Sequence, residues 1–242
     1  MHDAGVQCNA GPKVVGERWL EALELGAMPP ASRTKTQHNK IQYLLSELTE
    51  GYVATVDWPA NFMTDELMQL HPDAVVICTT RDPESWARSL AILGQVMDNW
   101  YFPILVSVLP KVGLHARWRE GWEKMVRSRY QVLSSASEHF NITTHEDYLR
   151  KNVHEEKLHF YSLGSGWKPL CEILGVPVPD MPFPYRNRGD DIRRTYRNFM
   201  FAGAAAWTGI FGSAFATWWF LLRGNCMRSV LTGLKSLIPR KS

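Results

Sequence analysis

An arginine that follows a strand-like segment is the strongest candidate for chemistry in this chain. Residues 74–80 are apolar and of strand length, and they lead directly into Arg81. Asp82 is a good N-cap residue, and Pro83 suits the first position of a helix. A guanidinium beside the free N–H groups of a helix start is suited to binding a phosphate. The pattern therefore predicts a phosphate position at Arg81; the structural alternative is that Arg81 pairs with Asp82 or Glu84.

Asp57 is the second candidate, because it closes another strand-like run, residues 52–57. In an open parallel sheet, ligands collect at the carboxyl ends of the strands, and both Asp57 and Arg81 are expected at such ends. Asp57 could cap a helix, pair with Arg81 or act as a general base. On the helix predicted after Arg81, Ser85 and Ser89 are four positions apart and therefore share one face.

Several familiar site motifs are absent or incomplete. Residues 5–13 partly resemble a P-loop. Five residues separate the glycines instead of four, a proline precedes the lysine, and no Ser or Thr follows it. The four cysteines lie far apart without metal spacing, so no metal site is expected, and Cys78 is expected to be a buried free thiol. A net charge of +3 is mild and gives no case for a nucleic-acid partner.

Strand-like and helical segments alternate through the first 190 residues. Runs of β-branched and aromatic residues predict strands at 52–57, 74–80 and 158–163. Helices are predicted at 13–25, 41–48, 61–70, 83–97, 113–140 and 166–174. Residues 32–40 are expected to form a loop, and residues 101–114 a lid or membrane-facing loop. Strands separated by helices imply parallel pairing, so the predicted fold class is α/β.

Two blocks of the sequence resemble the P-loop sulfotransferase-like proteins of fungi. The first is VDWPANFMTDELMQLHPDAVVICTTRDPESWARS at residues 56–89, and the second is GWKPLCEILGVPVPDMPFPYRN at residues 166–187. Their order and spacing agree with the family pattern. The resemblance covers residues 1–190 and implies a P-loop NTPase-like fold, a three-layer parallel sheet flanked by helices.

The resemblance also implies an activity and a cofactor. Sulfotransferases move a sulfuryl group from 3′-phosphoadenosine 5′-phosphosulfate to an alcohol or an amine. In the wider family an Arg and a Ser eight positions later bind the donor's 3′-phosphate, and Arg81 and Ser89 match that spacing. A catalytic base commonly follows the preceding strand, where Asp57 falls, although the family base is typically His or Glu.

The N-terminus departs from the family pattern. Family members begin with a strand and a loop such as GxxRTGTTSLKxAL, which cradles the 5′-phosphosulfate, and residues 1–13 contain nothing of that kind. The expectation is therefore an N-terminally truncated sulfotransferase-like fold that lacks the P-loop. Three functions stay open: a sulfotransferase acting in secondary metabolism, a catalytically inactive member that serves as an interaction protein, and a hydrolase or dehydratase that uses Asp57.

An uncharged run of 24 residues, 199–222, lies near the C-terminus between Arg197 and Arg223. As a helix it would measure about 36 Å, enough to cross a hydrocarbon core of about 30 Å with some tilt. The alternative is a buried hairpin or core helix. The predicted organisation is an α/β domain at 1–190, a basic juxtamembrane segment at 191–198, a transmembrane helix at 199–222 and a basic tail at 223–242.

The expected localisation is a membrane, with a single pass near the C-terminus and the main domain in the cytosol. No signal peptide is visible at the N-terminus, and scattered unpaired cysteines suit a reducing compartment. Basic residues flank the run equally on both sides, so the positive-inside rule gives a tie. Glycosylation at the sequon that begins with Asn141 would overturn this topology. The predicted partners are the lipid bilayer and a small apolar acceptor.

Overall fold

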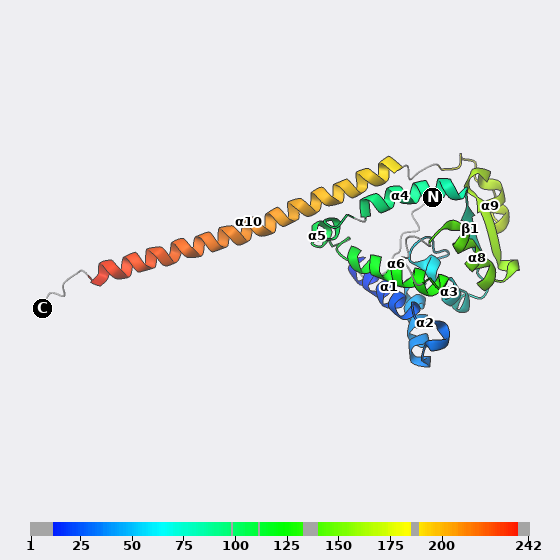
Figure 1. The fold of residues 1–242 in the computed structure, drawn as a ribbon, viewed down its shortest axis with the longest axis horizontal. Coiled ribbons are helices and arrows are strands. Elements are labelled where there is room, and N and C mark those ends of the chain that lie inside the picture. The colour runs from blue at the N-terminus through cyan, green and yellow to red at the C-terminus, as the bar shows by residue number, and fades with distance from the viewer. Residues whose placement is uncertain (1–11, 98, 111, 133–139, 185–188, 237–242) are drawn as a thin grey trace.

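The computed structural model describes residues 12–97, 99–110, 112–132, 140–184 and 189–236. It shows a mixed α/β body from which one long helix projects (Figure 1). The main elements are α1 (Pro12–Gly26), α2 (Lys35–Thr49), α3 (Thr64–Leu70), β1 (Val76–Thr80), α4 (Pro83–Met97), α5 (Phe102–Val106), α6 (His115–Tyr130), α8 (Ile142–Asn152), β2 (Leu158–Ser162), α9 (Trp167–Leu174) and α10 (Gly189–Ser236). Four short 3₁₀ helices join them: η1 (Pro30–Ser32), η2 (Ala60–Met63), η3 (Glu155–Lys157) and η4 (Leu163–Ser165).

The sheet pairs β1 with β2 in parallel, with Val76 opposite Leu158 and Thr80 opposite Ser162. Two of the three predicted strands are thereby confirmed. The strand predicted at residues 52–57 is wrong: this segment is irregular with bends at Val53 and Asp57, and Val53 and Val56 are 102% and 84% exposed. In the described part of the chain the sheet has two strands, instead of the broad three-layer sheet expected from the family resemblance.

Most of the predicted helices are confirmed. The segment 83–97 is α4, residues 61–70 are η2 followed by α3, and α9 ends at Gly175, whose φ of 63° is left-handed as in a C-terminal helix cap. The segment 113–140 is wrong at its end, because α6 stops at Tyr130 and Gln131 adopts a left-handed φ of 55°. Part of that prediction, residues 133–139, lies outside the described residues.

The loop predicted at residues 32–40 is wrong, because α2 begins at Lys35. Its start is a capping box: the Gln37 backbone N–H donates to the Thr34 hydroxyl oxygen at 3.3 Å, and the Thr34 N–H donates to the Gln37 side-chain oxygen at 2.9 Å. The pattern Thr-x-x-Gln is a recognised helix-start signal. Its polar residues concealed it from a prediction based on apolar periodicity.

The main core lies among α1, α2, η2, α3 and α6. Trp19, Leu20 and Leu23 of α1 are buried. They are joined there by the following buried side chains: Ile41, Leu44, Leu45 and Leu48 of α2, Phe62 and Met63 of η2, and Met125 and Val126 of α6. The two-stranded sheet has a smaller core of its own, which packs Cys78 against α8. The body is therefore a helical cluster joined to a small parallel sheet.

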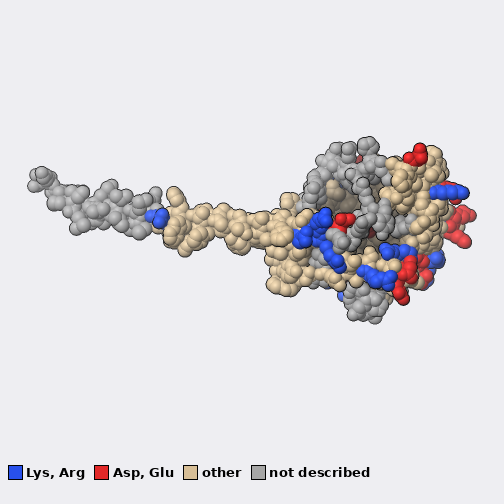
Figure 2. All heavy atoms as spheres, turned by 90° about the horizontal axis from the view of Figure 1, so that it is seen from above, with Lys and Arg blue, Asp and Glu red and all other residues tan. Residues whose placement is uncertain are grey.

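The projecting helix α10 contains the predicted run 199–222. Residues 191–223 are long and apolar enough to span a membrane, and only 6% of the apolar window is buried. Figure 2 shows the projecting rod with uncharged side chains along its described length and a basic one at its outer end. The buried hairpin or core helix that was the alternative is therefore wrong. Residues 102–106 of the predicted lid form α5, which packs against α10 where it leaves the body (Figure 1).

Candidate functional site

The carboxyl edge of the sheet brings Arg81 and the segment after β2 to the same side. Arg81 follows Thr80, and Thr80 lies opposite Ser162 in the parallel register. Arg81 is exposed, and no partner for its guanidinium occurs among the residues that the structure describes. Strand ends at such an edge are where open α/β sheets place their ligands. Arg81 therefore lies at the strand end where it was predicted, and its guanidinium is accessible to a ligand.

The helix α4 after Arg81 starts at Pro83 as predicted, and both acidic residues at its start have partners within the helix. Asp82 Oδ2 accepts the backbone N–H of Ser85 at 2.8 Å and so caps α4. Glu84 pairs with Arg88 at 3.5 Å, and Arg88 also donates to Ser85 Oγ at 2.9 Å. The alternative in which Arg81 pairs with Asp82 or Glu84 is absent from this structure.

Ser89 lies on α4, one turn beyond Ser85, and is exposed. Because residues four apart share a helix face, Ser89 lies on the same face as Ser85. Ser85 is already used by Arg88. On this face, Ser85 accepts the hydrogen bond from Arg88 and Ser89 does not.

Asp57 has a different setting from the one expected. Because residues 52–57 form no strand, Asp57 does not lie at the end of one. It occupies a turn with a left-handed φ of 60°, and its carbonyl accepts the backbone N–H of Asn61 at 3.0 Å. The next residue, Trp58, packs edge-on against Phe62 at 5.3 Å and Trp118 at 6.1 Å. The exposed Asp57 thus directly precedes an aromatic cluster on the helical part of the body, which contains Trp58, Phe62, Trp118, Tyr130, Phe140 and His145.

A turn that the sequence pattern did not predict follows β2, at the same edge of the sheet as Arg81. Gly166 has a left-handed φ of 72°, which favours glycine, and its carbonyl accepts the Tyr161 hydroxyl at 2.7 Å. Lys168 is exposed in the first turn of α9. A strand followed by Gly-Ser-Gly and a lysine was the available signal, but it was interpreted as an ordinary helix start. Lys168 adds a second cation near this edge.

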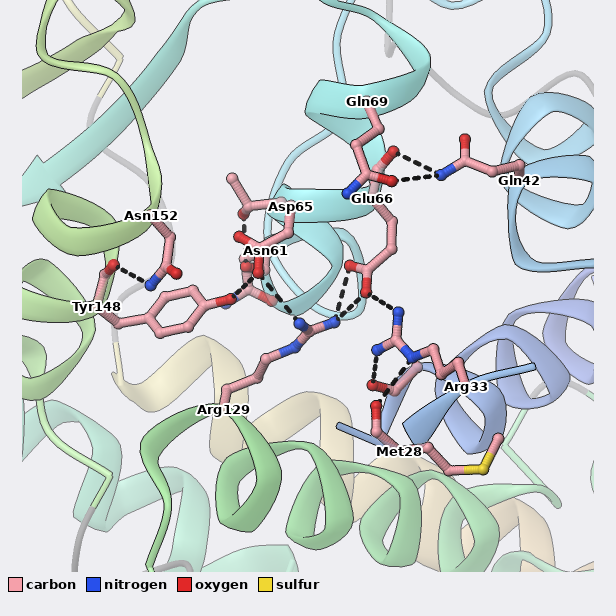
Figure 3. Close-up of polar contacts among 12 residues, drawn as sticks. Met28, Arg33, Gln42, Asn61, Asp65, Glu66, Gln69, Arg129, Tyr148 and Asn152 are labelled. Carbon is pink, nitrogen blue, oxygen red and sulfur yellow. Dashed lines mark hydrogen bonds and ion pairs between the residues drawn. The ribbon is translucent and has the colours of Figure 1, made fainter. Parts of the chain in front are cut away.

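A buried ionic network holds the helical part of the body together (Figure 3). Arg129 of α6 donates to both carboxylate oxygens of Glu66, at 2.6 and 2.8 Å, and to Asp65 at 3.2 Å. Arg33 donates to Glu66 at 2.7 Å, and Tyr148 of α8 donates to Asp65 at 2.6 Å. The side chains of Arg33, Arg129 and Glu66 are at most 4% exposed. Two cations thus balance two anions, and of the four side chains only Asp65, at 23% exposed, reaches water.

The network changes the titration of its members. Burial and the neighbouring carboxylates Asp65 and Glu66 raise the pKa of the Tyr148 phenol, although the Arg129 charge opposes that rise. Burial alone would lower the pKa of Arg129, but Glu66 and Asp65 favour its charged form and the pKa is raised overall. Both groups therefore keep their protons at neutral pH, and the network is a structural connection between α3, α6, α8 and the chain after α1.

His145, on α8, lies within the aromatic cluster. The ring contacts Phe62 at 6.5 Å between centroids, and Nδ1 lies 2.8 Å from the Tyr130 hydroxyl. Burial lowers the pKa of His145 and raises the pKa of Tyr130. At neutral pH a protonated phenol and a neutral imidazole therefore share this hydrogen bond.

The stability of the body should fall in mild acid because of His145. Its pKa is lower in the folded state than the ordinary value of about 6.5, so the unfolded chain binds the proton more tightly. The contribution is complete above about pH 6.5 and is lost as the pH falls toward the folded-state pKa, with a slope of at most about 1.4 kcal/mol per pH unit. Urea unfolding of wild type and His145→Gln in mild detergent, from pH 8 to 5 in about half-unit steps, measures this slope. Parallel curves for the two proteins would contradict it.

Cys78 and Cys171 are buried free thiols, as predicted for Cys78. Burial raises the pKa of Cys78 to about 11. A thiolate is the nucleophilic form of cysteine, so Cys78 is inert at neutral pH. In the described ranges, no group of three or more His, Cys, Asp or Glu residues is placed to hold a metal ion.

Comparison with known proteins gives the family of this chain. A family model described as a sulfotransferase domain matches residues 7–192. A relative from Aspergillus versicolor, Ava biosynthesis cluster protein M, is 28% identical over 163 residues, which cover 61% of this chain and 58% of the relative. The chain thus spans little more than half the length of that relative. The matched family covers the whole α/β body and ends at the start of α10. The chain belongs to the sulfotransferase domain family.

Proposed function

We propose that this protein is a membrane-anchored sulfotransferase-like transferase that moves a sulfuryl group to a small apolar acceptor in secondary metabolism. The family supports the reaction class. The relative's name, a biosynthesis cluster protein, supports the metabolic setting. The observation that carries the proposal is Arg81, an exposed guanidinium at the carboxyl end of β1 beside the start of α4, without a partner among the described residues.

The residues present fit one part of the donor 3′-phosphoadenosine 5′-phosphosulfate. Arg81 would hold its 3′-phosphate with charge-assisted hydrogen bonds, and Ser89 would add a hydroxyl from the same helix. The donor, when bound, supplies the activated sulfuryl group. Asp57 is proposed as the base that takes the acceptor's proton; its exposed carboxylate beside Trp58 supports an apolar acceptor at that position.

The anchoring part of the proposal is that α10 crosses the bilayer once, with the α/β body on the cytosolic side. The apolar length of residues 191–223 and the free cysteines of the body support this arrangement. An acceptor dissolved in the membrane would then reach the body along its anchor. Asn141 would stay unmodified in the cytosol, where its side chain caps α8 by accepting the Thr144 N–H at 2.8 Å.

Arg81→Ala should weaken binding of 3′-phosphoadenosine 5′-phosphate, because it removes a charged hydrogen-bond donor to the 3′-phosphate. The loss of such a contact costs about 1.5–3 kcal/mol, or roughly tenfold to more than a hundredfold in Kd. Isothermal titration calorimetry of the detergent-solubilised full chain measures it. Arg88→Ala is the matched control, because Arg88 lies on the same helix start but is already paired with Glu84 and Ser85.

Two results of the titration would overturn the proposal. The first is an equal loss of affinity in Arg81→Ala and Arg88→Ala, which would mean a general charge effect. The second is no heat from wild type where an intact family member binds, which would favour a non-catalytic interaction protein. Transfer of labelled sulfate to an acceptor by the purified chain would exclude that second reading.

A further inference from the structure

The short helix α5 packs against α10 at the point where the long helix leaves the body (Figure 1). Trp207 Nε1 of α10 donates to the carbonyl of Ile104 at 2.9 Å. A methyl group added at Gly203 would collide with the carbonyl of Leu105, so the two backbones are as close as a glycine allows. The position of α5 along the axis of α10 is therefore fixed between Gly203 and Trp207.

The length of the apolar run places this contact inside the membrane. The apolar residues beyond Trp207 end at Leu222, and as a helix they measure about 22 Å. A hydrocarbon core is about 30 Å thick, so the span must start near Gly203 or earlier. Displacement of the span outward would bring Arg223, which directly follows the run, into the hydrocarbon, and Arg228 comes five residues later. If α10 crosses the bilayer, residues 203–207 and the α5 segment fixed to them lie at or below the boundary of the hydrocarbon.

The surface of the α5 segment suits that depth. Its inward side chains Phe102 and Val106 are buried in the body. The outward side chains are Trp100, Tyr101 and Ile104, at 80%, 37% and 55% exposed. An exposed cluster of this kind marks an interaction site, and Trp and Tyr favour the membrane–water interface.

A groove between α5 and α10 continues this surface. It has a volume of about 390 Å³ and is lined by apolar residues only: Ile104, Leu105, Ala204, Trp207 and Phe211. Exposed residues on the body side of the groove include Arg194 and Arg197 of α10, which suits the headgroup layer. Arg197 and Arg223 are about 39 Å apart along the helix, close to the full bilayer thickness of about 40–45 Å. The cations therefore lie at the two headgroup layers when the groove lies in the hydrocarbon.

We propose that α5 is a second membrane contact of this protein, lying in one leaflet beside α10, with phospholipid acyl chains in the α5–α10 groove. The proposal rests on the crossing of the bilayer by α10 and not on sulfuryl transfer. In this arrangement the face of the body that carries α5 enters one leaflet without crossing the membrane, and the rest of the body lies above the lipid.

Photo-crosslinking of the full chain in vesicles tests this proposal. The vesicles contain phosphatidylcholine and phosphatidylglycerol, with a fraction of phosphatidylcholine that carries a diazirine in its acyl chain. After illumination and trypsin digestion, mass spectrometry locates the modified peptides. We expect modification of peptide 198–223, which contains the span, and of peptide 89–111, which contains α5, but not of peptide 41–81, which contains most of α2 and all of α3.

The variant Ile104→Asp sharpens the test. The backbone carbonyl of residue 104 still accepts the hydrogen bond from Trp207, so the contact between α5 and α10 is kept. A carboxylate on the outward face of α5 is costly in hydrocarbon. Modification of peptide 89–111 should be lost while that of 198–223 is kept. Tyr43→Asp, at a position of similar exposure on α2, should leave both unchanged. Modification of 198–223 alone in wild type would overturn the α5 contact, and modification of neither peptide would overturn the span on which it rests. Calorimetry with the nucleotide reports on the proposed function independently of either result.

Discussion

Replacing Glu66 with glutamine should lower the free energy of unfolding of the body by about 3–5 kcal/mol, the range for breaking a buried ion pair from one side. Glu66 is the anion shared by Arg33 and Arg129, and its side chain is 2% exposed. Glutamine keeps the volume but removes the charge, so Arg33 loses its carboxylate partner and Arg129 keeps Asp65 as its remaining one. Arg33 also holds the chain after α1 through the carbonyls of Gly26 and Met28, so the loss should loosen that connection too.

Urea unfolding in mild detergent, followed by tryptophan fluorescence, measures the effect of Glu66→Gln. The matched control is Glu84→Gln, which makes the same chemical change at a side chain that is 85% exposed in its pair with Arg88. Surface pairs of this kind contribute little, so the control should unfold at the wild-type urea concentration. Equal midpoints for the two variants would mean that the network does not stabilise the fold.

The elements around β1 were predictable because their signals are local. A strand of β-branched residues, Asp82 as the N-cap and Pro83 at the helix start all act within a few residues of one another, and α4 has the predicted bounds. The position of Arg81 at a strand end follows from these elements alone. The projecting helix was predictable for the same reason, because an uncharged run of 24 residues needs no partner in the chain to be recognised.

The segment 52–57 shows where local signals fail. Valines at positions 53 and 56 favour a strand, but a strand needs a neighbour to pair with, and both side chains lie in solvent in this structure. The conformation of Asp57 depends on how η2 and Trp58 pack on α6, which is a long-range property. Its proposed role as a base is therefore an inference from the family resemblance, whereas Arg81 has support from the geometry of the sheet edge.

The buried network was beyond prediction from the sequence. Arg33 and Arg129 lie far along the chain from the neighbouring carboxylates Asp65 and Glu66, and Arg33 lies just inside a segment that the sequence predicts as a loop. A charged residue is normally expected at the surface, and only the tertiary structure shows that Arg33 and Arg129 meet at one carboxylate. The α5–α10 contact was likewise hidden, because it joins residues about a hundred positions apart in the chain. The apolar character of residues 101–114 allowed a lid or a membrane-facing loop, and the second of these stays a prediction.

Phe62→Ala should destabilise the body by about 3–5 kcal/mol, as is typical for deleting a buried aromatic ring. Phe62 is 2% exposed and contacts Trp58, Tyr130 and Phe140 at centroid distances of 5.3, 6.0 and 5.7 Å. The neighbours are large rings on separate elements, so they cannot collapse fully into the space. Urea unfolding of the full chain in detergent measures the loss. Tyr43→Ala, which removes an aromatic ring that is 57% exposed, is the control and should unfold near wild type.

Phe62→Ala should also change the pKa of His145, because it changes how well the imidazole is shielded from water. The pKa of His145 is lowered by burial, and the Phe62 ring is one of the groups around the imidazole, at 6.5 Å between ring centroids. Water admitted by Phe62→Ala would reduce the cost of charging the imidazole, so its pKa should rise toward the ordinary value. The stability of Phe62→Ala should then depend less on pH between about 5 and 6.5 than that of wild type. An unchanged slope would show that Phe62 stabilises the cluster by packing alone and does not keep water from the histidine.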